Sequence, residues 1–153
     1  TDIPLNQTGI AQANLLKEQL KDIKFDKVIC SPLTRAKQTC EIIVGSLDNV
    51  IIDERIIERD FGEFEGLTRT EFNFVDFCNK SSVNYERAES VQSVEDRVFN
   101  LLDELKQEPN KNVLLISHGG VGCVFRSYFE GIPENGNYLK LLINNGKPVS
   151  YEF

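Results

Sequence analysis

The chain has 153 residues, 41% of them hydrophobic and 27% charged, and its 24 acidic and 17 basic residues give a net charge of −7. These proportions are typical of one globular domain, here residues 1–153, that is long enough to bury a sizeable core. The acidic balance argues against a nucleic-acid partner or an anionic membrane surface, and no apolar run approaches the ~18 residues of a membrane span.

Helix and strand patterns alternate along the first third of the chain. Asn6 is the expected N-cap of a helix with an apolar face at three- and four-residue steps. Residues 26–31 form an apolar run typical of a strand. Ser31 followed by Pro32 predicts the start of a second amphipathic helix, and residues 49–53 are again strand-like.

The middle of the chain loses this alternation. Residues 54–90 are charged, aromatic and polar, and we expect loops with one short helix near 68–78. Four aromatic residues there are compatible with either a wall of the substrate site or a small core: Phe72, Phe74, Phe77 and Tyr85. Ser93 with Asp96 predicts a capping box at the start of the next helix.

The last third returns to the alternating pattern. Residues 112–117 predict an apolar strand and residues 119–131 the helix that follows it. Residues 138–144 and 148–153, separated by a turn, predict a closing pair of strands. Alternating elements of this kind favour an α/β fold with three layers, in which helices cover both faces of a mostly parallel sheet.

The four cysteines show no paired spacing. Cys30, Cys40 and Cys123 sit in apolar stretches, which favours buried, reduced thiols in a cytoplasmic protein. A disulfide framework is therefore not expected, and a zinc site is disfavoured because the chain contains one histidine.

Two of the predicted strands end in the same way. Ser31 and Ser117 each follow an apolar run and precede a helix, with Arg35 in the first turn of one helix and His118 at the entrance to the other. Parallel sheets bind ligands at the carboxyl ends of their strands, where helix N-termini offer free N–H groups. A guanidinium, an imidazole and the amides of a following glycine pair, which begins at Gly119, describe a receptor for a phosphate-like anion.

Each of these residues also has a less specific interpretation. A lone histidine at a strand end is often structural, and an arginine in a first helical turn is often a surface charge. A serine hydrolase that uses Ser117 or Ser31 with His118 is a rival hypothesis. The chain lacks the G-x-S-x-G elbow of such enzymes, and Ser117 should point to the opposite face of the strand from His118.

Five stretches, in order, resemble the histidine phosphatase superfamily, the phosphoglycerate mutase-like group. They are "DIPLNQTGIAQA" (2–13), "SPLTRAKQT" (31–39), "ERDFGEFEG" (58–66), "AESVQSVEDR" (88–97) and "SHGG" (117–120). Together they span almost the whole chain. The resemblance implies the phosphoglycerate mutase-like fold and a phosphomonoester hydrolase that works through a phosphohistidine.

The resemblance also implies a role for each matching residue. Arg35 matches the arginine that holds the phosphoryl oxygens, and Glu58 matches the general acid. His118 matches the second histidine, which stabilises the transferring group, and Gly119 joins it in the phosphate site. The implied substrate is a small phosphorylated metabolite, and neither a metal nor another cofactor is expected.

One departure from the family pattern is large. The chain contains no R-H-G motif, which in the family carries the nucleophilic histidine on the first strand. We expect this strand and its nucleophile to lie upstream of Thr1 and the 153-residue chain alone to be inactive. A phosphate-binding module without a nucleophile is an alternative. A phosphoglycerate mutase is another, although Arg69 and Arg87 are the only arginines in 67–92. Substrate identity and oligomeric state stay open.

Overall fold

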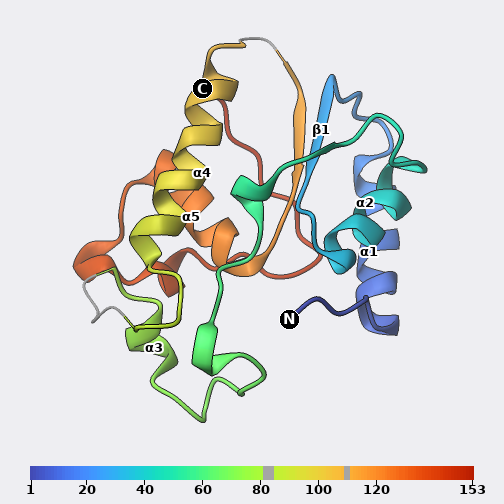
Figure 1. Ribbon diagram of the computed structural model, residues 1–153. Helices are drawn as coiled ribbons and strands as arrows, with labels where there is room; N and C mark the ends of the chain where they lie inside the picture. Colours follow the sequence, from blue (N-terminus) through green and yellow to red (C-terminus); the bar gives the residue numbers. More distant parts are fainter. Residues whose placement is uncertain (81–84, 109–110) are drawn as a thin grey trace.

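Figure 1 shows a computed structural model that describes residues 1–80, 85–108 and 111–153. In this part of the chain three parallel strands form a sheet in the order β2-β1-β3. They are β1 (Lys27–Cys30), β2 (Ile51–Ile52) and β3 (Val113–Ile116). The expected parallel sheet is confirmed.

Helices cover both faces of this sheet, as the alternating sequence pattern predicts. One face carries α1 and α2, and the other carries α4 and α5 (Figure 1). The helices are α1 (Gln7–Leu20), α2 (Thr34–Val44), α4 (Val91–Lys106) and α5 (Gly119–Glu130). The three-layer α/β architecture is therefore confirmed.

The larger core lies on the α4 and α5 side. Val94, Val98 and Leu101 of α4 are each about 1% exposed and pack with Val121 and Val124 of α5. These α4 positions recur at three- and four-residue steps, so one helix face buries them together. A smaller cluster, which includes Cys30 and Cys40, lies between β1 and α2.

Two predicted helix starts are wrong by a few residues. Helix α2 begins at Thr34, because Ser31 turns its hydroxyl toward His118 instead of capping the helix, and the carboxylate of Asp2 accepts from the Thr34 amide at 2.7 Å. Helix α4 begins at Val91, because the Ser90 hydroxyl accepts from the Ser93 amide at 3.0 Å. Helix α2 thus begins after the predicted cap Ser31, and helix α4 begins before the predicted cap Ser93.

The predicted closing strands are also wrong. Residues Tyr138–Leu141 form the short 3-10 helix η4, and the residues after it have no regular secondary structure. Tyr151 and Phe153 pack their rings on Phe129 of α5, with centroids 4.6 and 5.4 Å away. The aromatic side chains at the chain end therefore pack on helix α5, and this segment does not pair as a strand.

The segment between β2 and α4 contains the 3-10 helices η1 (Glu54–Ile56) and η2 (Gly62–Phe64) and the short helix α3 (Phe74–Phe77). The short helix expected near 68–78 is confirmed. Residues 61–80 and 85–88, which we call the aromatic lobe, lie below the carboxyl ends of β1 and β3 (Figure 1). Phe77 is fully buried within it.

Ring contacts show that the aromatic lobe is a small core of its own. Phe77 packs against Phe72 at 5.5 Å and Tyr85 at 5.6 Å between centroids. Gly62 has φ +54, and a Cβ there would overlap the Arg87 carbonyl, so this turn requires glycine. Of the two interpretations that the sequence allows for these aromatic residues, the contacts favour the core.

The cysteines follow the prediction. Cys30, Cys40 and Cys123 are buried, Cys78 is half-buried, and all four are free thiols. In the described part of the chain, no helix is both long enough and apolar enough to cross a membrane.

Candidate active site

Ser31 and His118 meet where β1 and β3 end side by side. Cys30 pairs with Ile116 in the register of the two strands, and the Ser31 amide continues the ladder by donating to the Ile116 carbonyl at 2.9 Å. The residues that follow Cys30 and Ile116 in the chain therefore lie at the same edge of the sheet. The Ser31 hydroxyl and His118 Nε2 are 2.6 Å apart.

Glu58 lies at the N-terminus of α5, immediately beyond His118. One carboxylate oxygen accepts from the Gly120 amide at 3.3 Å, and the other accepts from the Arg59 amide at 3.0 Å. A Cβ on Gly120 would stand 2.6 Å from the Glu58 carboxylate, closer than such contacts allow. Glycine at position 120 therefore makes room for the carboxylate at this helix end.

Arg35 occupies the first turn of α2, as predicted, and its guanidinium donates to the Thr1 carbonyl at 3.1 Å. It also lines an open pocket of about 360 Å³ together with the start of α1 and Asn145. The neighbouring Thr34 donates both its amide and its hydroxyl to Asp2, and these bonds lower the pKa of the Asp2 carboxyl. The hydrogen bonds to Asp2 and Thr1 therefore fix the start of α2 and the side chain of Arg35.

The electrostatics of the site keep His118 neutral. Burial first, and then the positive charges of Arg35 and Arg97, lower the pKa of His118 from 6.5 to about 4. The influence of Arg35 on this imidazole places the two residues in the same electrostatic environment. A bound phosphate dianion would act in the opposite direction, because a nearby negative charge favours the imidazolium.

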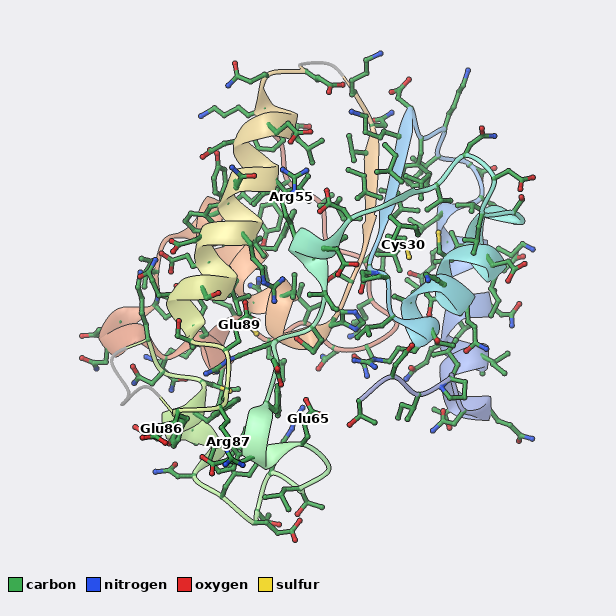
Figure 2. All side chains as sticks on the ribbon, viewed as in Figure 1. Cys30, Arg55, Glu65, Glu86, Arg87 and Glu89 are labelled. Carbon is green, nitrogen blue, oxygen red and sulfur yellow. The ribbon has the colours of Figure 1, made fainter. Side chains whose placement is uncertain are left out.

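Arg59 anchors the residue next to Glu58. Its guanidinium lies 3.7 Å from the centre of the Phe77 ring and donates to the carbonyls of Glu89 and Phe77, each at 2.6 Å. Burial lowers the pKa of Arg59. Figure 2 shows Glu89 near the start of α4, whereas Glu65 and Arg87 lie in or beside the aromatic lobe. Glu89 also forms an ion pair with Arg97, with 2.8 Å between the two groups.

The structure therefore brings most of the predicted residues to one edge of the sheet. Glu58, His118 and Gly119 meet at the start of α5, and the charge of Arg35 reaches His118. Two features were not predicted from the sequence: the bond from the Gly120 amide to Glu58, and the charge of Arg97 that acts on His118. Arg97 lies at the end of the 88–97 stretch, but its effect on His118 gives no local signal because it depends on how α4 packs.

The serine hydrolase hypothesis finds little support in this geometry. Ser117 donates its hydroxyl to the Ile56 carbonyl at 2.7 Å, away from His118, as the strand alternation predicts. Ser31 does contact His118, but it is 0% exposed and a substrate carbonyl could not reach it. Among the described residues, no group of three or more histidine, cysteine, aspartate or glutamate side chains could hold a metal ion.

Comparison with known proteins gives a consistent result. Residues 1–151 match the histidine phosphatase superfamily (branch 1). The chain is 38% identical over 122 residues to the uncharacterized phosphatase PhoE of Bacillus subtilis (strain 168), covering 78% of this chain and 61% of that protein. It is 30% identical over 143 residues to the probable phosphoglycerate mutase GpmB of Escherichia coli O1:K1, covering 87% and 66%.

Solved structures agree with the sequence comparison. The crystal structure of a phosphoserine phosphatase from Entamoeba histolytica, in complex with 3-phosphoglyceric acid, superimposes with a TM-score of 0.77 at 31% identity. The match covers 95% of this chain and 76% of that one. Against the Bacillus and Escherichia relatives, the chain spans 61% and 66% of their lengths.

Proposed function

Because this chain belongs to the histidine phosphatase superfamily (branch 1), we propose that the intact protein hydrolyses small phosphomonoesters through a phosphohistidine intermediate. One observation carries the proposal: a carboxylate, Glu58, and a neutral imidazole, His118, meet at the N-terminus of α5 on the carboxyl edge of the sheet. That edge is where parallel α/β sheets bind their ligands.

The phosphoryl group is held by cations and amides. Arg35 and His118 contact its oxygens, and the amides at the start of α5, that of Gly119 among them, supply N–H donors. Phosphoryl transfer places negative charge on these oxygens, which fixed donors stabilise without reorganisation. The N-terminal end of a helix adds a partial positive charge at the same point.

Glu58 is the general acid in this scheme. As the P–O bond to the substrate breaks, its carboxyl proton passes to the leaving oxygen. In the second half of the reaction its carboxylate takes a proton from the attacking water. The Gly120 and Arg59 amides fix the carboxylate beside the proposed phosphate site. The carboxyl proton is thereby held close to the leaving oxygen of the substrate.

The nucleophile in this proposal is a histidine of an R-H-G motif on a segment that precedes Thr1 in the intact protein. His118 is the only histidine of the chain, and its Nε2 is bonded to Ser31. The nucleophilic nitrogen displaces the alcohol to form a P–N bond, and water then breaks that bond to release phosphate. The family pattern supports this assignment.

Hydrolysis is favoured over the mutase reaction by the few cations around the site. A bisphosphorylated, carboxylated ligand needs several arginines to bind it. Residues 67–92 contain two, and the guanidinium of one of them, Arg69, lies 4.8 Å from the centre of the Phe74 ring. Transfer of phosphate to a hydroxyl acceptor, without release of inorganic phosphate, would decide for the mutase. Phosphate binding without turnover by the intact protein would decide for a binding module.

The experiment that tests the acid role compares two leaving groups in the intact protein. We expect Glu58→Gln to lower kcat on an alkyl phosphate by roughly 10²–10⁴-fold and on an aryl phosphate far less, because an aryl oxide leaves without a proton. Glu63→Gln, an exposed carboxylate a few residues away, is the matched control and should change neither rate. Equal losses on both substrates would remove Glu58 from this role. Acid-labile phosphate trapped on the protein tests the intermediate itself.

A further inference from the structure

The hydroxyl of Ser31 is fully buried, and its hydrogen bonds can be counted. Ser31 is 0% exposed, and its oxygen accepts from the Leu33 amide at 3.4 Å. That bond uses one lone pair and leaves the hydroxyl hydrogen in need of an acceptor. In the described part of the chain, His118 Nε2, 2.6 Å away, is the acceptor within reach. Buried hydroxyl groups are rarely left without one.

His118 has one proton to place, since its imidazole is neutral at physiological pH. If Nε2 carried that proton, two hydrogens would face each other or the Ser31 hydrogen would lose its acceptor. If Nε2 accepts, the proton is on Nδ1. The cost of leaving a buried donor unsatisfied favours the second arrangement.

The other ring nitrogen is open to a ligand. No described residue forms a hydrogen bond with His118 Nδ1, and no buried side-chain nitrogen or oxygen of the described residues lacks a partner. Nδ1 is therefore reached by solvent, at the helix end where Glu58 binds the Gly120 amide. A proton on Nδ1 makes this nitrogen a donor, whereas a bare lone pair would repel a phosphoryl oxygen.

We propose that Ser31 is a positioning residue whose buried hydroxyl holds His118 in the Nδ1–H tautomer, so that Nδ1–H donates to the phosphoryl group. The inference deepens the proposed function and rests on it for the identity of the ligand.

The direct test is the imidazole ¹⁵N spectrum of the intact protein near pH 7, with His118→Gln identifying the His118 signals. We expect a protonated Nδ1 and an unprotonated Nε2 in the wild type. In Ser31→Ala the two tautomers should mix, because Nε2 loses its donor. A wild-type imidazole protonated on Nε2 overturns the proposal, and so does an Ser31→Ala spectrum that keeps the wild-type tautomer.

The matched control is Ser127→Ala. Ser127 is a 3% exposed serine of α5 whose hydroxyl donates to the Val124 carbonyl at 2.7 Å, so this variant also removes a buried hydroxyl but leaves His118 untouched. Its imidazole spectrum should match the wild type; a change as large as that in Ser31→Ala would show a general packing effect and overturn the proposal. On titration with inorganic phosphate Nδ1 should stay protonated, and loss of the Nδ1 proton on phosphate binding also overturns the proposal. This arm needs only the wild type.

Activity separates this inference from the proposed function. We expect Ser31→Ala to lower kcat by roughly tenfold or more with a smaller change in KM, short of the ~10²–10³ lost with a whole phosphate donor. If the wild-type protein hydrolyses no phosphomonoester, the proposed function fails while the spectra still decide the tautomer. If it does, and kcat of Ser31→Ala is unchanged, the positioning role fails alone.

Discussion

At the scale of single residues, the site depends on atoms that carry no charge. The Gly120 amide binds Glu58, and the missing Cβ at this position leaves space for the carboxylate. The Ser31 hydroxyl contacts His118 in the same way, through one short bond. Charged residues thus define what the site can do, and small neighbours define where the charged groups lie.

Gly120→Ala tests the first of these contacts. The new methyl group would meet the Glu58 carboxylate at 2.6 Å and displace it, so we expect kcat on an alkyl phosphate to fall by roughly 10²-fold or more. Stability should not fall, because alanine is favoured over glycine in a helix by about 1 kcal/mol. Gly122→Ala is the control, since its Cβ would meet only the flexible end of Ile143, at 3.2 Å. Retained activity in Gly120→Ala would contradict the geometry.

The lowered pKa of His118 predicts how stability depends on pH. The folded value, about 4, lies below the ordinary 6.5, so the unfolded chain takes up the proton first as pH falls. The neutral imidazole of His118 contributes about 3 kcal/mol to the free energy of unfolding above pH 6.5. This contribution is lost as the pH falls from 6.5 to about 4. Urea unfolding of wild type and His118→Gln from pH 8 to 4 measures it. The stability difference should shrink in that window; a constant difference would rule the shift out.

At the scale of elements, the starts of the helices organise the site. The start of α5 receives Glu58, the start of α2 presents Arg35 and is capped from a distance by Asp2, and the start of α4 is capped by Ser90. Each start satisfies amides that have no partner within their helix. The bonds at the starts of α2 and α5 therefore place Arg35 and Glu58 and also stabilise these helices, and the Ser90 bond stabilises α4.

Ser90→Ala tests where α4 begins. Loss of the bond from the Ser93 amide should lower the free energy of unfolding by about 1 kcal/mol, the usual cost of removing a serine N-cap. Ser93→Ala should cost less, because the Ser93 hydroxyl donates only to the carboxylate of Glu89 on the exposed side. Urea denaturation of both variants measures this order. The opposite order would restore the capping box expected from the sequence.

At the scale of the whole molecule, the aromatic lobe is joined to the sheet and helices by buried polar groups. Arg59 reaches the carbonyls of Phe77 and Glu89. Glu95 of α4, 6% exposed, binds Lys80 at 2.7 Å and accepts from the Tyr138 hydroxyl. Burial raises the pKa of Tyr138, so it remains a donor. The lobe is thereby fixed beside the carboxyl ends of the strands, where a substrate would enter.

Metal removal tests the charge balance of the whole site. In the proposed function, Arg35, His118 and helix amides meet the phosphate charge, and the described residues offer no cluster of metal ligands. We therefore expect the phosphatase activity of the intact protein to survive dialysis against a chelator, with kcat changing less than about twofold. Loss of a catalytic metal would lower kcat far more, because such a metal stabilises the transition state by several kcal/mol. Loss of activity on chelation, restored by a divalent cation, would contradict this.

The sequence by itself determined the layers of this protein and the residues that meet at its edge. The periods of α1, α4 and α5 and the apolar runs of β1 and β3 predict an α/β fold, because hydrophobic period distinguishes helix from strand locally. The family motifs point to Arg35, Glu58 and His118, and the strand ends account for why Arg35 and His118 share one edge.

Only the tertiary structure decided the partners of those residues. The contact of Ser31 with His118, the cap that Asp2 provides to α2 and the charge of Arg97 near His118 join segments that lie far apart in the chain. The aromatic pattern after Tyr138 looks like a strand, but Tyr151 and Phe153 pack on Phe129 of α5. Local periodicity gives the face that a side chain presents, whereas its partner depends on what the rest of the fold brings to that face.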